Sequence, residues 1–258
     1  MFAKGKRPGR AAIQAFISAH HSVAISHDPS NETPLHLVAA DGETIEPIIE
    51  KVKPAHDLVW LELLREGLVF DLCGLNPGEA VDFPQVEHLF DLPEMPGAAT
   101  YDALHLAPGQ HLAGGERSVP VVKGLVGLAR DLVHHFDDLQ AVVWPPSASA
   151  IGQRFFESVS TAWLEGGAFP ALGLTAFRET IDGALQSRGL DFWIGQELRI
   201  EPPLSNDKVA ATRLGVRLIN QLVLVGGIDG SERIIAPDGT RLIMRASRNG
   251  KFVRVARE

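Results

Sequence analysis

Apolar residues recur at intervals of three and four along three stretches of the chain, which is the spacing of an amphipathic helix. The clearest stretch is 119–136, where Ser118 stands as a helix cap and Pro120 falls in the first turn. The second covers 150–165. The third begins near residues 205–207 and ends at a pair of glycines. The sequence therefore predicts three long helices in its second half.

Short apolar runs between turn-forming residues predict strands. Gly67 divides the apolar stretch 58–73 into a helix or strand before it and a strand after it. The other elements expected from such runs are strands over 35–39, 103–107, 139–144, 171–182 and 196–201, a helix over 43–53, and a short helix or strand over 11–19. Asp-Gly and Asn-Gly pairs favour tight hairpins and predict a C-terminal meander of three strands, 232–236, 240–246 and 251–256.

Together these elements indicate an α+β fold with a mixed or mainly antiparallel sheet, packed amphipathic helices and a C-terminal β-meander. Strict alternation of strand and helix holds only over about 102–182, which disfavours a purely parallel sheet. The proline- and glycine-rich stretch 74–100 is typical of a long connection. We therefore expect a flexible basic N-terminus at 1–10, an N-terminal lobe at 11–100 and an α+β domain at 101–258.

The composition is that of an ordinary globular protein: of 258 residues, 45% are apolar and 22% are charged. No apolar run is long enough for a membrane-spanning helix, and the basic N-terminus leads into no apolar segment of a secretory signal. Cys73 is the single cysteine, which excludes an internal disulfide, and its apolar neighbours predict a buried, unreactive thiol. The sequence thus predicts a cytoplasmic protein.

Charge is distributed unevenly around a net value of −8. Residues 241–258 hold six basic side chains and one acidic one, whereas residues 11–240 hold 14 basic and 31 acidic ones. An acidic body repels phosphate backbones, and the C-terminal basic residues alternate with apolar ones as on the outer face of strands. A nucleic-acid patch would extend across neighbouring elements as well. We therefore expect a basic protein partner, and neither nucleic acid nor a membrane.

Sequence motifs for catalysis or cofactor binding are absent. The chain holds no phosphate-binding loop, dinucleotide fingerprint, nucleophile elbow or paired-histidine zinc helix, so no cofactor is expected. Ten histidines leave open a metal site, for which the candidates are His20, His21 and His27. Adjacent histidines point in different directions on helices and strands, which favours a surface role over a shared metal.

A second group of candidates surrounds the end of the strand expected over 139–144. Ser147 and Ser149 follow Trp144 closely and precede a helix, a location where functional groups gather in α/β folds. Helix capping is the simpler role for them, because a serine nucleophile needs a base. The histidines that could supply this base are His105, His111 and His135. The glycine-rich loop 108–118 is a candidate lid.

The segment 187–200, SRGLDFWIGQELRI, resembles a signature of the bacterial domain of unknown function 4261. The matching positions are Gly189, Leu190, Glu197 and Leu198, whereas 193–195 departs from the Phe-Gly pair of that family. The likeness covers about residues 100–258. The family has no established activity, so the resemblance implies a fold and no catalytic residue. The same segment is less closely similar to suppressor-of-fused-like domains, which bind proteins and include toxin-immunity proteins.

We therefore expect a protein-binding module without enzymatic activity, such as an adaptor or an immunity protein. The alternative hypothesis is a hydrolase or transferase with its site between Trp144 and Ser149, under the loop 108–118. An apolar or acidic surface patch favours the first hypothesis. A deep pocket in which Trp144, a serine and a histidine converge favours the second. The sequence leaves the oligomeric state open.

Overall fold

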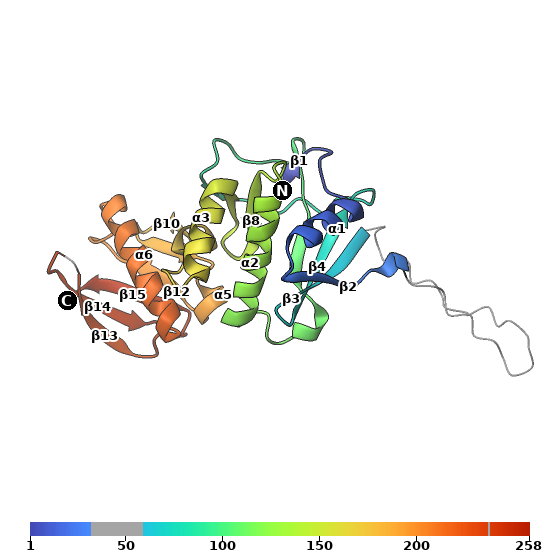
Figure 1. The fold of residues 1–258 in the computed structure, drawn as a ribbon. Helices are drawn as coiled ribbons and strands as arrows, with labels where there is room; N and C mark the ends of the chain where they lie inside the picture. The colour runs from blue at the N-terminus through green and yellow to red at the C-terminus, as the bar shows by residue number, and fades with distance from the viewer. Residues whose placement is uncertain (32–58, 237) are drawn as a thin grey trace, which may run out of the picture.

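The computed structural model describes residues 1–31, 59–236 and 238–258, and Figure 1 shows it as a ribbon. The helices of these residues are α1 (Arg10–Ala19), α2 (Val119–His135), α3 (Gln153–Leu164), α4 (Ala171–Leu174), α5 (Asp191–Ile194) and α6 (Lys208–Val225). The three long helices expected from the apolar spacing are α2, α3 and α6. The strand and the helix expected over 35–39 and 43–53 lie outside the described residues.

A four-stranded antiparallel sheet is built from the first part of the chain. In spatial order its strands are β2 (Val23–His27), β3 (Val59–Arg65), β4 (Leu68–Leu75) and β7 (His105–Pro108). Gly67 makes the turn between β3 and β4 with a φ of 80°, a conformation that glycine adopts without strain. The apolar stretch that Gly67 divides is therefore a hairpin, and its inner residues Leu61, Leu63, Phe70 and Leu72 are buried.

Helix α2 packs closely on this sheet because two of its glycines face β3 and β4. A Cβ atom at Gly124 would lie 2.9 Å from Cδ1 of Leu68 and 3.0 Å from Cζ of Phe70, which is closer than packed carbon atoms normally approach. A Cβ atom at Gly127 would lie 3.2 Å from the guanidinium carbon of Arg65. The side chain of Arg65 thus lies between the sheet and the helix.

A six-stranded mixed sheet forms the C-terminal part of the molecule. In spatial order its strands are β10 (Ala176–Glu179), β11 (Leu185–Arg188), β12 (Glu197–Ile200), β15 (Phe252–Arg257), β14 (Arg241–Ala246) and β13 (Ser231–Ile235). All neighbours are antiparallel except β12 and β15, which are parallel. Helix α6 lies across one face of this sheet (Figure 1). Asp207 caps the start of α6 by accepting the backbone N–H groups of Val209 and Ala210.

Two smaller sheets and two helices lie between the large sheets. One small sheet contains β5 (His88–Phe90), β9 (Ser149–Gly152) and β8 (Ala141–Trp144), and the other pairs β1 (Phe2–Ala3) with β6 (Tyr101–Asp102). Helices α2 and α3 pack on each other in the middle of the molecule (Figure 1). The α+β class predicted from the sequence is confirmed, and the C-terminal meander is formed by β13, β14 and β15.

The helix expected over 150–165 starts later than predicted, because residues 149–152 form a strand. They form β9, which pairs with β8 and β5, and α3 begins only at Gln153. The pairing occurs because Pro145 and Pro146 turn the chain back after β8. Within the described residues, no helix has both the length and the apolar character needed to cross a membrane.

The N-terminal residues are part of the fold rather than the flexible arm expected from the sequence. Phe2 is 2% exposed and β1 pairs with β6. The ammonium group of Lys4 lies 2.7 Å from a carboxylate oxygen of Asp102, and the guanidinium of Arg7 lies 3.6 Å from the other. The basic residues look unpartnered in the sequence because Asp102 lies far along the chain.

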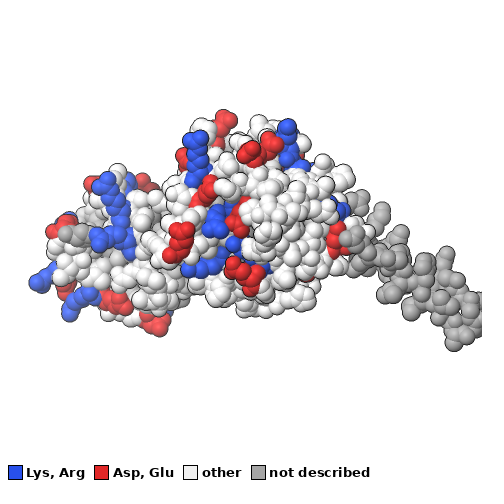
Figure 2. Space-filling model, in the orientation of Figure 1, with Lys and Arg blue, Asp and Glu red and all other residues white. Residues whose placement is uncertain are grey.

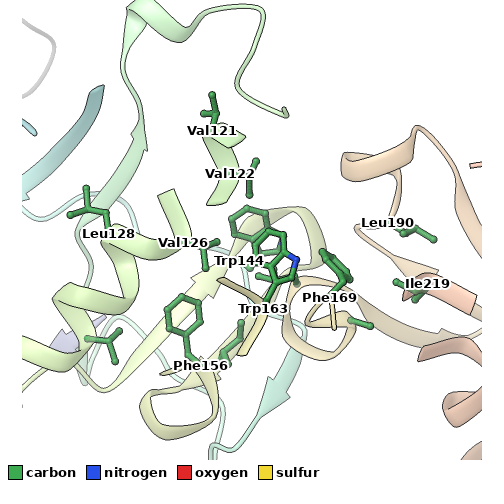
Figure 3. Packing of buried hydrophobic residues seen from close by; sticks show 14 of the residues in the cluster. Val121, Val122, Val126, Leu128, Trp144, Phe156, Trp163, Phe169, Leu190 and Ile219 are labelled. Carbon is green, nitrogen blue, oxygen red and sulfur yellow. The ribbon is translucent and has the colours of Figure 1, made fainter. Parts of the chain in front are cut away.

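The expected lobe boundary before residue 101 does not coincide with a boundary between sheets. Strand β7 follows that position in the sequence, yet it completes the four-stranded sheet by pairing with β4. One continuous cluster of buried side chains extends from Phe2 to Val255. Figure 3 shows the middle of this cluster, where side chains of α2 lie beside Trp144 and Phe156.

Candidate functional site

A cavity of about 810 Å³ lies beside Trp144 and is called the Trp144 cavity below. Its walls come from helix α2, strands β7 and β8, and the short helix α5. The side chains of α2 in its lining are Leu125, Val126, Ala129 and Leu132. Both ends of the loop expected as a lid, at Pro108 and Glu116, also line it. This size and apolar lining are those of sites that take small molecules or side chains of a partner.

Aromatic rings form one end of the Trp144 cavity. The rings of Trp144 and Phe192 meet edge to face with centroids 5.4 Å apart, and Trp193 stacks on Trp144 at 5.9 Å. Trp163 and Phe169 continue the cluster through edge contacts with Trp193. Edge-to-face and offset ring pairs restrain one another, so this wall is held in a defined shape.

Two indole N–H groups in this aromatic wall have no hydrogen-bond acceptor among the described residues. They are Nε1 of Trp144 and Nε1 of Trp193, and both atoms are buried. A buried donor without an acceptor costs about 1–3 kcal/mol. Trp144 also lines the cavity, but its Nε1 atom is buried in the wall, so an occupant that carries a carbonyl or carboxylate oxygen would meet this donor only after the ring turns.

The charged side chains in the lining of the Trp144 cavity are acidic. They are Glu79, Asp82 and Glu116, and the described lining includes neither lysine nor arginine. Backbone N–H groups of Glu116 and Gly114 lower the pKa of the Glu116 carboxyl, which is therefore ionised at neutral pH. On the face of the molecule shown in Figure 2, by contrast, groups of both signs are mixed. One basic group lies beside this acidic lining, because the guanidinium of Arg117 is 5.3 Å from the centre of the Phe192 ring.

The loop that carries Phe192 and Trp193 is held in place by Glu197. One carboxylate oxygen of Glu197 accepts the backbone N–H of Gly189 at 2.7 Å, and the other accepts that of Leu190 at 3.3 Å. The hydroxyl of Ser187 donates to the same carboxylate and accepts the backbone N–H of Leu198 at 2.7 Å. The resemblance segment 187–200 is therefore internally hydrogen-bonded, which gives its glycine and glutamate a structural role.

Replacing Gly189 by alanine is expected to lower the free energy of unfolding by at least about 2 kcal/mol. Gly189 has a φ of 87°, and a Cβ atom there would lie 2.9 Å from the backbone of Ser147. Gly195→Ala is the matched control, because Gly195 also has a positive φ, 74°, but nothing lies within 4 Å of its Cβ position. Urea denaturation compares the two variants. Equal losses would show that the contact with Ser147 is unimportant.

The two candidate serines lie outside the lining of the Trp144 cavity. Ser147 and Ser149 are fully buried, and their hydroxyl oxygens lie 2.8 Å apart. The Ser147 hydroxyl also lies 3.0 Å from the carbonyl oxygen of Gly173, to which it donates. Neither is a helix cap, since Gly152 precedes α3 and no side chain caps it. The serines connect the turn after β8 to the segment at Gly173.

The three candidate histidines lie in different places. His105 lines the Trp144 cavity, whereas His111 lies in the loop expected as a lid and His135 at the end of α2. The ring of His135 packs against Phe16 with centroids 5.3 Å apart. The structure therefore brings His105 and Trp144 to one cavity, without a serine beside them.

Sequence reasoning missed the juxtaposition of Cys73 and His105. The register of β4 and β7 places these two residues directly opposite each other, and both line the Trp144 cavity. Burial and the negative charge of Asp71 raise the pKa of the Cys73 thiol. The group is therefore a thiol rather than a reactive thiolate at neutral pH. No local sequence pattern marks this pair, because it depends on the pairing of two distant strands.

The metal candidates His20, His21 and His27 are not gathered by the fold. His20 ends α1 and contacts the rings of Phe16 and His135, while His27 ends β2 and contacts the ring of Trp60. Partial burial lowers the pKa of His20. Over residues 1–31, 59–236 and 238–258, no group of three His, Cys, Asp or Glu side chains could hold a metal ion.

Comparisons with known proteins found no match to this chain. No protein-family model matches the chain, and it matches no curated protein and no solved structure. The function must therefore be argued from the residues of the site.

Proposed function

We propose that the protein is a non-catalytic binding module whose Trp144 cavity takes an apolar segment of a partner protein, flanked by lysine or arginine. The observation that carries this proposal is the combination of an apolar interior with charged lining residues that are all acidic. Apolar side chains of the partner would fill the space beside Leu125 and Val126. Basic flanking residues would meet Asp82 and Glu116.

Binding of a peptide would allow the ring of Trp144 to turn its buried, unpaired N–H toward an acceptor. A peptide offers backbone carbonyl oxygens, which accept hydrogen bonds from such a donor. Burying one leucine or phenylalanine side chain contributes about 1.5–3 kcal/mol. A few such anchors suffice for a specific interface, since a small number of buried side chains carries most of the binding energy of protein complexes.

Selection of displayed random peptides against the folded protein tests the proposal. We expect the enriched peptides to combine aromatic or aliphatic residues with lysine or arginine. Ala129→Phe, which places a ring inside the cavity, should weaken the selected peptides at least tenfold in calorimetric titrations. Ala15→Phe on the exposed face of α1 is the matched control and should leave the affinity unchanged. Enrichment of acidic peptides, or equal binding by Ala129→Phe, would overturn the proposal.

Charge and hydrogen bonding give two further variants for the same titrations. The double change Asp82→Asn and Glu116→Gln should weaken binding mainly at low salt, because salt screens exposed charges. Trp144→Phe keeps the ring but removes the donor, and should weaken peptide binding by about tenfold. A Trp144→Phe variant that binds as tightly as the parent protein would show that the occupant supplies no acceptor there.

Acyl transfer at Cys73 is the second candidate function, and the pairing of Cys73 with His105 is the observation that favours it. A histidine beside a cysteine can act as the base that generates a thiolate. The pH profile of thiol alkylation distinguishes the two functions. A Cys73 pKa below about 7.5 would favour an activated nucleophile, whereas the raised pKa expected from burial favours the binding module.

A further inference from the structure

A row of arginines crosses the outer face of the six-stranded sheet. The register places Arg245 of β14 opposite Arg254 of β15, and Arg254 opposite Arg199 of β12. Arg199 lies opposite Gln186 of β11, and Gln186 lies opposite Arg178 of β10. Residues directly opposite each other project from the same face of a sheet. The row therefore spans five strands, or about 20 Å at the usual strand spacing.

This arginine row faces away from helix α6. A Cβ atom at Gly215 of α6 would lie 2.6 Å from the ring of Phe177 and 3.5 Å from Ile200, so α6 covers the opposite face. Phe177 precedes Arg178 in β10, and Ile200 follows Arg199 in β12. Because neighbouring side chains on a strand point to opposite faces, the two arginines lie on the face away from α6. The side chain of Arg254 is 59% exposed, and Arg178 and Arg245 are exposed as well, whereas Arg199 is 13% exposed and Gln186 is buried.

The protein neutralises the middle of the arginine row but not its two ends. Like charges directly opposite one another on neighbouring strands repel, so an anion on the row would be stabilising. Arg199 is paired with two carboxylates, and one of them, Glu201, also lies 3.7 Å from Arg254. Arg178 and Arg245 form no ion pair with any other described residue. Both ends of the row thus carry full positive charge.

A hollow of about 390 Å³ adjoins the row on the same sheet. The side chains that line it are Glu87, Arg178, Gln186, Ser187, Arg188, Glu197 and Phe252. Phe252 contributes an aromatic ring, and Gln186 contributes an amide whose oxygen lies 3.4 Å from Nη1 of Arg199. The carboxyl oxygens of Glu197 already accept hydrogen bonds from Gly189, Leu190 and Ser187. A planar heterocycle with polar edges suits such a hollow, because nucleobases stack on aromatic rings and hydrogen-bond through their edges.

We propose that this face binds single-stranded nucleic acid, with phosphates on the arginine row and a base in the hollow against Phe252. The sequence argued against nucleic acid because residues 11–240 are acidic and because the C-terminal basic residues alone suggested an isolated strand face. Strand pairing extends these residues to β10 and β12, which lie outside that segment. Arginine binds phosphate through two parallel hydrogen bonds, and a single strand leaves its bases free to stack. This inference does not depend on the Trp144 cavity.

Fluorescence anisotropy with a labelled oligouridine of about 12 nucleotides tests the proposal, since sites on sheet platforms span about 4–16 nucleotides. We expect binding at low salt that weakens as salt is added. The double variant Arg245→Gln, Arg254→Gln should bind at least about tenfold more weakly, with the salt slope reduced by about 1.4. The matched control is Arg213→Gln, Arg217→Gln, which removes two exposed arginines from α6, and it should change affinity less than twofold.

Two comparisons distinguish the proposed ligand from other polyanions. Phe252→Leu should weaken oligouridine about tenfold while leaving inorganic polyphosphate unaffected. Duplex RNA of the same length should bind more weakly than the single strand. No binding of oligouridine at about 50 mM salt, equal loss in the α6 control, or equal affinity for polyphosphate would each overturn the proposal.

Discussion

Asp131→Ala is expected to lower the free energy of unfolding by about 3–5 kcal/mol, because it leaves a buried guanidinium without a counter-ion. The carboxylate of Asp131 on α2 pairs with Arg65 at the end of β3, and both side chains are at most 10% exposed. The other carboxylate oxygen accepts a hydrogen bond from Nη2 of Arg130 at 2.8 Å. Since Arg65 lies against Gly127, the charge has no room to turn toward water without moving the helix.

Urea denaturation with two controls checks this expectation. The double variant Arg65→Leu, Asp131→Leu removes both charges and should recover most of the loss, because apolar replacement of a buried ion pair is often nearly neutral. Glu179→Ala breaks the exposed pair with Lys208 and should cost less than about 1 kcal/mol. A loss below about 1 kcal/mol for Asp131→Ala would show that Arg65 finds water or another partner.

Stability should fall as pH rises through the titration of Glu197. Burial, followed by the neighbouring carboxyl of Asp191, raises the pKa of Glu197 from 4.5 to about 7. The folded protein therefore holds a proton between these values that the unfolded chain has released. This contribution is fully present below pH 4.5 and is lost as pH rises through 7. Its size is on the order of 3 kcal/mol.

The difference in unfolding free energy between the parent protein and Glu197→Gln isolates this titration from that of other groups. Relative to Glu197→Gln, the parent protein should lose stability between pH 5 and pH 8. Asp191→Asn should move the loss to lower pH, because it removes the second cause of the raised pKa. A difference that is flat with pH, or that grows with pH, would contradict a protonated Glu197 in the folded state.

Glu197 also illustrates which properties of a residue cannot be predicted from the sequence. The sequence marked Glu197 only through a resemblance to a family signature, and it did not predict the loop that Glu197 closes. That Glu197 holds a proton could not be predicted either, because its pKa depends on burial by the surrounding sheet and on Asp191. For the same reason Ser147 and Ser149 were candidates by their place after a strand, while the hydrogen bond of Ser147 to Gly173 could not be predicted.

Elements that depend on neighbours within a few residues were predicted well. The amphipathic spacing over 119–136 correctly predicted α2. Asp207 caps the start of α6 and the glycine at 226 ends it, as their local chemistry requires. The hairpin glycines likewise placed β13, β14 and β15. Residues 1–10 were mispredicted because their partners, such as Asp102, lie far away in the chain.

The sequence alone predicts the α+β class, the long helices and the C-terminal meander, because these follow from local spacing and turn chemistry within each stretch of the chain. It does not predict the Trp144 cavity, the pairing of Cys73 with His105 or the arginine row. Each depends on the register between strands that are distant in sequence, and a shift of one residue would turn the side chains to the opposite face. Tertiary packing alone selects that register, because only the assembled core distinguishes the buried face of each strand from the exposed one.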